Sequence, residues 1–166
     1  MARRVYDLDV RAEKPPPKAY GINQLRETWV VKESVRRSMQ SNRSTETEPE
    51  RLLRSALWSA GLRGYRKNVR KLPGSPDVVF GVRRVVVFVH GCFWHRCPKC
   101  TRNVHPKTNS AFWRAKFERN VARDKKNKVA LKKLGFKVIV VWECDVRKDA
   151  ARVVRKVEKA IIESGS

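Results

Sequence analysis

The sequence predicts an α/β domain in which helices cover both faces of a mixed central sheet. Two apolar, β-branched runs, at residues 84–89 and 136–142, have the length and composition of buried strands. Segments with helical spacing of apolar residues precede, separate and follow them, in the order α-β-β-β-α-β-α. With 166 residues, 41% of them hydrophobic, the chain can bury the core of one domain.

The first predicted helix spans about residues 47–60. Thr47 and Glu50 have the spacing of a capping box, and Pro49 suits a first helical turn. Gly61 provides a stop at the C-terminal end. The residues of its apolar stripe are Leu52, Leu53, Ala56, Leu57 and Ala60.

Three strands are predicted to follow this helix. A strand around residues 65–69 leads into a turn at LPGSP, residues 72–76. The runs 77–80 and 84–89 are separated by Gly81-Val82-Arg83, which indicates a hairpin. The second run is apolar on both faces, so we expect it to be a central strand.

The second half of the domain is predicted to be helix, strand and helix. A long helix runs from about Ser110 to Leu134, where Gly135 ends it. A second buried strand at 136–142 follows, and Asp149 can cap the last helix. The apolar residues that give these helices their inward faces are Trp113, Phe117 and Val121 in the first, and Val153, Val154, Val157, Ala160 and Ile161 in the second.

The chain is predicted to divide into a basic, proline-rich N-terminal arm, residues 1–33, and a single domain, residues 34–166. KPPPK at residues 14–18 cannot form a helix or a central strand. We expect flexibility up to about residue 30, then a short helix that DNA could order; a tail with no role in DNA binding is the alternative. The basic residues that could reach phosphates or a minor groove from there are Arg36, Arg37 and Arg43.

The charge of the chain predicts a polyanionic partner. Residues 1–50 hold 10 basic and 8 acidic residues, whereas residues 51–166 hold 29 and 8, so the domain carries +21 of the total +23. Such a body repels itself unless a polyanion neutralises it, which favours nucleic acid over a merely solvated basic face. No apolar run approaches the roughly 20 residues of a membrane helix, and we expect no secretory signal.

The cysteine pattern favours a metal site. Cys92, Cys97 and Cys100 form a C-x4-C-x2-C cluster, and Cys144 stands alone far downstream. In a chain without an export signal, this pattern favours bound Zn²⁺ over two disulfides or free thiols. Four thiolates complete a closed, structural zinc site, which would leave His90 and His95 free for other work.

Asp77 is the only acidic residue between residues 51 and 117, a stretch that holds 15 lysines and arginines. The surrounding charge favours its ionised form. One interpretation is a ligand for Mg²⁺, which prefers carboxylate and phosphate oxygens. A turn-capping or ion-paired aspartate after a proline is the equal alternative. If the two runs pair as a hairpin, Asp77 and His90 lie at the same end of it.

The residues around the first cysteines add proton-transfer and stacking groups. His90 and His95 could act near neutral pH as general bases, unless they are structural or bind the metal. Phe93 and Trp94 are adjacent, so they cannot both enter one core from a regular element. Together with Trp113 they could stack on or wedge between bases; packing over the zinc site is the alternative.

Four segments resemble the very-short-patch-repair (Vsr) mismatch endonucleases: PGSPDVVF, VVVFVHGCFWHRCPKC, PKTNSAFWRAKFERNVARD and VIVVWEC. TETEPERLLRSALWSAGLRGYR is similar to that family's first helix. The resemblance covers about residues 36–148, and HGCFWH followed by WEC is highly specific. It implies a restriction-endonuclease-like fold and a Mg²⁺-dependent DNA nickase. That activity cuts 5′ to the mispaired T of a T:G mismatch left by deamination of 5-methylcytosine.

The resemblance also implies roles by position. Asp77 and the main-chain carbonyl of Val89 would hold Mg²⁺, His95 would be the general base, and His90 would support it. Glu50, by itself a helix-capping partner, matches the active-site glutamate of the family's first helix. The remaining matches are the aromatic wedge, Phe93, Trp94 and Trp113, and the zinc ligands, Cys92, Cys97, Cys100 and Cys144.

Two features depart from the family's pattern. The best-studied pattern includes a histidine among the zinc ligands, whereas here all four are cysteines. Val89 stands where a threonine is frequent, which matters little if only its carbonyl is used. The second hairpin strand also lacks the acid-x-Lys of general restriction enzymes, so the histidines must supply that chemistry, as in the family.

Two other functions remain open from the sequence. One is a related endonuclease of the same fold with another DNA target, of the homing or defence type. The other is a non-catalytic, zinc-stapled nucleic-acid-binding protein, which would not need Asp77, His90, His95 and Glu50 together. We expect a monomer in the prokaryotic cytoplasm, associated with the nucleoid, whose partner is duplex DNA with a T:G mismatch; other repair proteins could join it.

Overall fold

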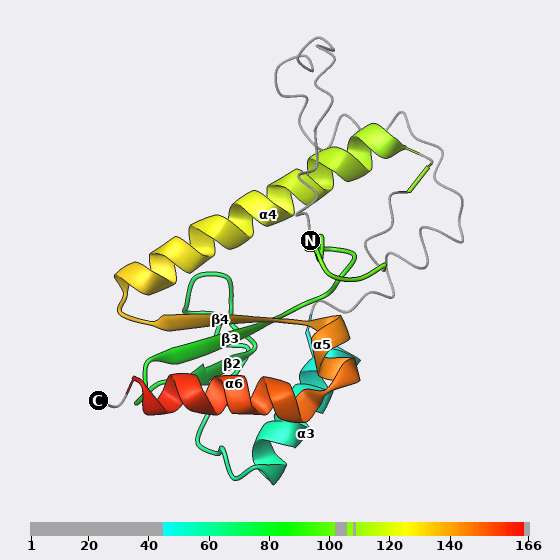
Figure 1. Cartoon of the computed structure of the whole chain (residues 1–166). Coiled ribbons are helices and arrows are strands. Elements are labelled where there is room, and N and C mark those ends of the chain that lie inside the picture. The colour runs from blue at the N-terminus through cyan, green and yellow to red at the C-terminus, as the bar shows by residue number, and fades with distance from the viewer. Residues whose placement is uncertain (1–44, 102–105, 108, 165–166) are drawn as a thin grey trace, which may run out of the picture. The chain divides into compact units, whose positions relative to one another are not determined.

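The computed structural model describes residues 45–101, 106–107 and 109–164. The predicted arm, its boundary and the short helix after residue 30 lie outside these residues. Figure 1 shows the elements in chain order: α3 (Glu48–Ser59), β1 (Arg66–Lys67), β2 (Val78–Phe80), β3 (Val85–His90), α4 (Ser110–Lys133), β4 (Lys137–Trp142), α5 (Glu143–Lys148) and α6 (Ala150–Ile162). The three helices and four strands expected within the described residues are therefore all present, with small changes at their ends.

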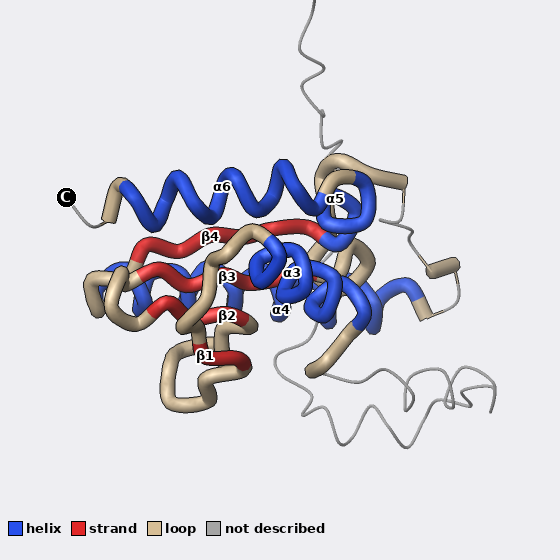
Figure 2. The backbone as a smooth tube through the Cα atoms, turned by 90° about the horizontal axis from the view of Figure 1, so that it is seen from below, coloured by secondary structure: helices blue, strands red, loops and turns tan. Residues whose placement is uncertain are grey.

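The four strands form one mixed sheet in the order β1-β2-β3-β4 (Figure 2). β2 pairs antiparallel with both β1 and β3, and β3 pairs parallel with β4. The parallel pair requires a crossover connection, which α4 provides. The predicted hairpin and the central position of β3 are confirmed, because β3 has a partner on each side.

Helices cover both faces of the sheet, because the central strand β3 is apolar on both of them. On one face Val85 and Val87 of β3 join a core formed with α3 and α6. On the other face Val86 packs with Val79 and with Leu131 of α4. Successive strand residues point to opposite faces, so a run that is apolar throughout needs cover on both sides. The expected helices on both faces are confirmed.

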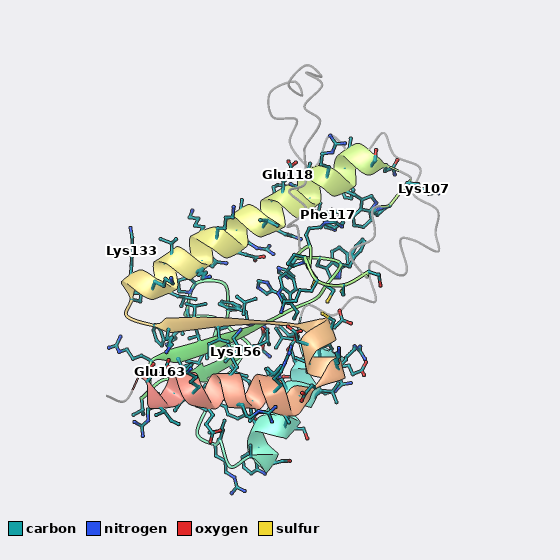
Figure 3. The ribbon with its side chains drawn as sticks, in the orientation of Figure 1. Lys107, Phe117, Glu118, Lys133, Lys156 and Glu163 are labelled. Carbon is teal, nitrogen blue, oxygen red and sulfur yellow. The ribbon has the colours of Figure 1, made fainter. Side chains whose placement is uncertain are left out.

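The strand at 136–142 was expected to be a buried strand, and the structure fully buries only one of its faces. β4 is an edge strand that is buried on alternate residues: Ile139 and Val141 are buried, whereas Val138 and Val140 are half-buried. The half-buried residues lie on the α4 side, where the helix leaves part of the sheet uncovered. The free edge is protected by α6, because the Lys156 ammonium donates to the Val140 carbonyl at 3.2 Å (Figure 3).

The structure adds one element that sequence reasoning missed. α5 follows β4 directly and carries Cys144. Its six residues turn the chain toward α6, which begins as predicted, with the Asp149 carboxylate accepting from the Arg152 amide at 2.8 Å. Cys144 therefore sits on a helical turn that is anchored at both ends.

The turn that leads into β2 packs against α4 through Gly74. Its φ of +76° is in the left-handed region, and a Cβ there would lie 2.6 Å from the Asn127 side-chain nitrogen. Gly64 has nearly the same φ, +78°, but a Cβ there would meet nothing within 4 Å. Comparing substitutions at the two glycines therefore distinguishes the cost of a positive φ from the cost of a steric contact.

We predict that Gly74→Ala lowers the free energy of unfolding by about 1 kcal/mol more than Gly64→Ala does. Both substitutions incur the cost of a positive φ, but only the first forces Asn127 to move. Chemical denaturation of both variants measures the difference. Equal losses would show that the turn and α4 do not press on each other.

Candidate active site

The hairpin register brings Asp77 beside the end of β3. Val78 pairs with Val87, so Asp77, one residue earlier, lies next to the last residues of the partner strand. The amide of Val89 donates to Asp77 Oδ2 at 2.7 Å. The Asp77 carboxylate at the start of β2 and His90 at the end of β3 therefore lie at the same end of the hairpin, as the sequence predicted.

The expectation that its basic surroundings keep Asp77 ionised is wrong, because the burial of the carboxyl outweighs the neighbouring positive charges. Burial raises the pKa of Asp77 to about 7, opposed by the hydrogen bond from the Val89 amide and reinforced by the Glu50 carboxylate. Arg54 and His95 are near enough that their charges lower this pKa. A half-buried carboxyl with a pKa near neutrality is well suited to exchange its proton for a divalent cation.

Two histidines stack face to face beside this carboxyl. The rings of His90 and His95 are 4.0 Å apart between centroids and 17° from parallel. His95 Nδ1 lies 2.5 Å from Asp124 Oδ2, so the carboxylate of α4 orients the imidazole and fixes its tautomer. The arrangement is a carboxylate–imidazole pair whose other ring nitrogen remains available for proton transfer.

Asp124 is the site residue that sequence reasoning missed. α4 contains nine lysines and arginines but only two acidic residues, Glu118 and Asp124. The argument that singled out Asp77, an isolated acid in a basic stretch, applies equally here. What the sequence lacked was the helix phase, which turns Asp124 toward the loop that follows β3.

His90 is held neutral. Burial lowers its pKa to about 4, the nearby charge of His95 lowers it further, and Asp124 acts in the opposite direction. The edge of His90 meets Trp142 of β4 at 5.4 Å between centroids and 78° between planes. A neutral imidazole in this position supports its stacked neighbour without competing for a proton near pH 7.

His90, His95 and Asp124 offer ligand atoms that all lie within 4.8 Å of one another. A metal ion could in principle use this set. However, an imidazole lone pair lies in the plane of its ring, and two nearly parallel rings direct their lone pairs side by side rather than toward one point. The stacked geometry therefore favours proton transfer over a shared ion.

Glu50 lies on the first turn of α3 and is only 4% exposed. Its carboxylate accepts from the Thr47 hydroxyl at 2.7 Å and from the Glu46 amide at 2.9 Å. The capping-box spacing is thus used, although the Thr47 side chain donates to the carboxylate rather than capping the helix backbone. The same carboxylate raises the pKa of Asp77, so Glu50 is both a capping partner and a neighbour of the site.

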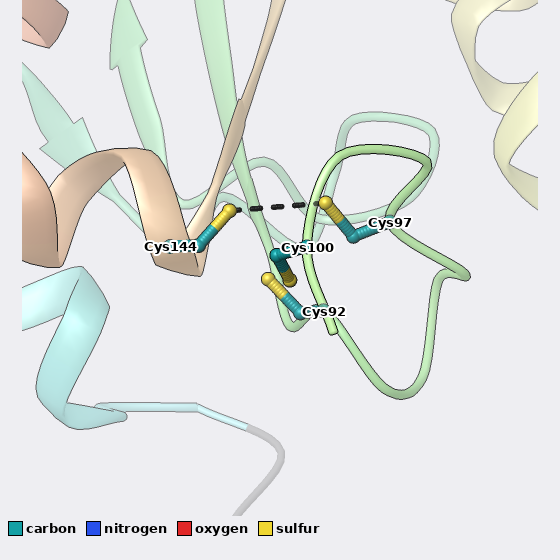
Figure 4. Close-up of side chains that lie close together, drawn as sticks. All are labelled: Cys92, Cys97, Cys100 and Cys144. Carbon is teal, nitrogen blue, oxygen red and sulfur yellow. Dashed lines mark hydrogen bonds between the residues drawn. The ribbon is translucent and has the colours of Figure 1, made fainter. Parts of the chain in front are cut away.

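The four cysteines form one cluster. Figure 4 shows Cys92, Cys97 and Cys100 of the loop converging on Cys144 of α5. All four are free thiols, their sulfur atoms lie within 4.8 Å of one another, and the Cys97 and Cys144 sulfurs are 3.8 Å apart. Bonds of about 2.3 Å from four sulfurs to one tetrahedral ion place those sulfurs about 3.8 Å from each other. The cluster therefore fits a single tetrahedral metal ion.

Polar contacts from the residues before and after Cys144 attach the cysteine loop to α5. The Cys92 amide donates to the Glu143 carboxylate at 3.3 Å, and Lys99 pairs with Asp145 at 3.0 Å. Arg147 binds Glu143 at 3.1 Å. It also reaches Glu48 of α3 with two hydrogen bonds, at 2.7 and 2.8 Å. A continuous series of side-chain contacts therefore connects the loop, α5 and the start of α3.

The aromatic residues form a compact cluster between the loop and α4. Phe93 lies at its centre, edge-on to Trp94, Trp113 and Phe117 at 5.0, 5.4 and 5.1 Å. Phe117 is buried and lies on the side of α4 that faces the loop (Figure 3). The three predicted wedge residues are brought together and are half-buried, so they pack in one cluster while part of each ring stays accessible.

Lys116 is a second residue that sequence reasoning did not single out. Its ammonium lies 4.9 Å from the Trp94 ring centroid and 5.4 Å from that of Trp113. Burial lowers its pKa, and the charge of Arg119 adds to that effect. The cation fixes the two indole faces relative to each other.

Comparison with known proteins identifies the class. Residues 30–102 match the family DNA mismatch endonuclease Vsr. The chain is 44% identical to the type II nicking enzyme V.NmeAIP of Neisseria meningitidis over 71% of this chain and 87% of that protein. It is 46% identical to the type II nicking enzyme V.XorIIP of Xanthomonas oryzae over 65% and 78% of the two chains. The DNA mismatch endonuclease Vsr of Escherichia coli is 39% identical over 67% and 70%.

These similarities identify the chain as a DNA endonuclease of the mismatch-endonuclease type, which is a hydrolase that acts on DNA. The chain belongs to the Vsr family. Within the part of the chain that the structure describes, no helix is both long and apolar enough to cross a membrane.

The contact between Arg147 and Glu48 generates a stability prediction. Their side chains are 33% and 54% exposed, so solvent screens the pair, but the two-pronged geometry is favourable. We expect a double-mutant cycle with Arg147→Ala and Glu48→Ala to give a coupling of about 0.5–1 kcal/mol in unfolding free energy.

A matched cycle with Arg152→Ala and Glu48→Ala is the control. Arg152 instead pairs with Asp145 at 3.5 Å, so its coupling to Glu48 should be close to zero. If both cycles give the same coupling, the net charge of the surface accounts for the effect and the specific bridge does not.

Proposed function

We propose that this chain is a Mg²⁺-dependent, zinc-stabilised endonuclease that nicks duplex DNA 5′ to the mispaired T of a T:G mismatch. This activity would start the repair of deaminated 5-methylcytosine. The observation that carries the proposal is the placement of Asp77 and the His95–Asp124 pair at one end of the central hairpin, beside the cysteine loop. A protein that only binds nucleic acid has no need of a half-buried carboxyl and an oriented imidazole within electrostatic reach of each other.

The proposed roles follow from the contacts. The Asp77 carboxylate and the Val89 carbonyl would hold Mg²⁺, which when bound supplies positive charge for the scissile phosphate and the departing 3′ oxygen. His95, oriented by Asp124 at 2.5 Å, takes the proton of the attacking water on its free ring nitrogen. In-line attack then leaves a 5′-phosphate and a 3′-hydroxyl.

The neighbouring residues would support this chemistry. His90, neutral because burial lowers its pKa to about 4, holds the His95 ring by stacking. Glu50 adds negative charge beside Asp77 and so favours a bound cation there. Phe93, Trp94 and Trp113 would wedge into the base stack beside the mismatch, as their shared cluster next to the site allows.

Zinc is the metal we assign to the four cysteines, in a structural role. A closed set of four thiolates leaves no coordination position for a substrate. The ion would join the loop that carries His95 to α5 through Cys144, and so hold the histidine against Asp77. We place the protein in the prokaryotic cytoplasm with the nucleoid, as a monomer on duplex DNA, where other repair proteins could meet the nick.

The central test is nicking of a T:G duplex, compared with T:A, with and without Mg²⁺. We expect T:G-selective, Mg²⁺-dependent nicking by the parent protein. In Asp77→Asn we expect a loss of at least about 10²-fold in rate with DNA affinity retained, because the substitution removes a metal ligand and no phosphate contact.

Asp149→Asn is the matched control, since it neutralises an aspartate that only caps α6 and asparagine caps equally well. It should nick at the parent rate. Parent-level nicking by Asp77→Asn would remove the proposed metal role.

Metal content tests the zinc assignment. We expect one zinc ion per chain, retained in His95→Ala but lost in Cys144→Ser, because the ligands are four cysteines and no histidine. The lost cross-link should lower the Tm of Cys144→Ser by at least about 8 °C, equivalent to about 2 kcal/mol or more. Zinc that leaves with His95 and stays without Cys144 would contradict the ligand set.

Nicking of a different DNA target is the second candidate function, because relatives at 38–46% identity are named type II nicking enzymes. The same site would then cut at other DNA sequences or mismatches. A panel of all mispairs in several sequence contexts, nicked under one condition, separates this candidate from T:G selectivity.

A further inference from the structure

A hollow of about 550 Å³ lies between α4 and the sheet, next to the catalytic groups. Its floor is the face of the sheet that α4 leaves open, and its walls include His90 and His95. Figure 1 shows why it exists: α4 runs obliquely and rises from the sheet toward its N-terminal end. The apolar residues of the floor are Phe88, Val138, Val140 and Trp142, all half-buried.

The rim of the hollow is positively charged. Arg123, Lys125 and Lys128 of α4 line it, and all three side chains are exposed. Within residues 45–101, 106–107 and 109–164, none of the three forms an ion pair. The carboxylate in the wall, Asp124, is already engaged by His95. The rim therefore carries cations that the described protein does not neutralise.

The size and chemistry of the hollow match one ligand. Its volume is within the range of small-ligand sites, so it admits part of one strand and excludes a duplex. An apolar floor suits a deoxyribose, and a cationic rim suits its phosphate. The hollow is also continuous with His95, the residue that would activate the attacking water.

We infer that this hollow is the subsite for the backbone of the cleaved strand, holding the sugar and phosphate next to the scissile one. Lys125 and Lys128 bind that phosphate, and the sugar lies over the β4 floor. This inference rests on the proposed nicking activity and adds to it the path of the strand beyond the site.

Lysine pairs on opposite sides of α4 supply the test in the full chain. Lys125→Ala/Lys128→Ala removes two charges from the rim. Lys126→Ala/Lys133→Ala removes two from the exposed outer side, where Lys133 points away from the sheet (Figure 3). Both doubles change the net charge equally. Affinity for a T:G duplex is measured across a salt series, and nicking is measured in single turnover.

For the rim double we expect at least about tenfold weaker binding and a salt slope smaller by about one, since one neutralised phosphate contributes about 0.9. The outer double should change the slope by less than about half a unit. Equal losses for the two doubles would overturn the inference, because the general positive charge of the helix would explain them. No loss for either double would also overturn it, because the rim lysines would then make no contact with the DNA.

A single neutral methylphosphonate in the DNA then locates the strand. Placed next to the scissile phosphate on the cut strand, it should weaken binding of the parent protein and have little added effect on the rim double. The same substitution on the uncut strand should weaken both proteins alike. The reverse pattern would assign the hollow to the other strand.

The two proposals fail in different ways. If the parent protein binds duplex but nicks nothing, the proposed activity fails, and the contrast between the rim and outer doubles still tests the hollow. If nicking is normal and the contrast is absent, the strand path is wrong and the activity stands.

Discussion

The hydrogen bond from the Val89 amide to Asp77 is the contact on which the site depends. It joins the start of β2 to the end of β3 at 2.7 Å, and it exists only in the observed hairpin register. A slip of one residue would turn every side chain of the strand to the other face. Since both faces of β3 are covered by helices, such a slip would also disrupt two cores, so the packing of the domain enforces the position of the carboxyl.

The second half of the site comes from elsewhere in the chain. Asp124 reaches His95 from α4, and Cys144 reaches the same loop from α5. Residues 91–101, the described part of the loop that carries His95 and three cysteines, form turns and bends rather than a helix or strand, so their shape depends on these anchors. A tetrahedral ion bound by four sulfurs, together with the polar contacts of Glu143 and Asp145 beside it, would order the loop that carries the histidine. The loop would then need no larger hydrophobic core to hold its shape.

The sequence was sufficient for the features that depend on local pattern. The hairpin, the central strand, both long helices and the Asp149 cap follow from periodicity and turn residues, and the structure confirms them. It was insufficient for features that depend on tertiary geometry. The exposure of one face of β4 arises from the tilt of α4, and the role of Asp124 from the helix phase relative to a loop. Neither quantity is encoded in the spacing of apolar residues.

The placement of charge on α4 ties fold to function. Its inward side carries Asp124, Asn120 and Phe117, which contact the cysteine loop, and so most of its cations other than Lys116 are distributed over the exposed sides. A helix that bound the sheet along its whole length would cover the half-buried residues of β4 and displace any strand from beside His95. The incomplete packing of α4 therefore has a consequence beyond stability: it leaves an electropositive opening beside the oriented imidazole of His95, where the proposed strand would lie.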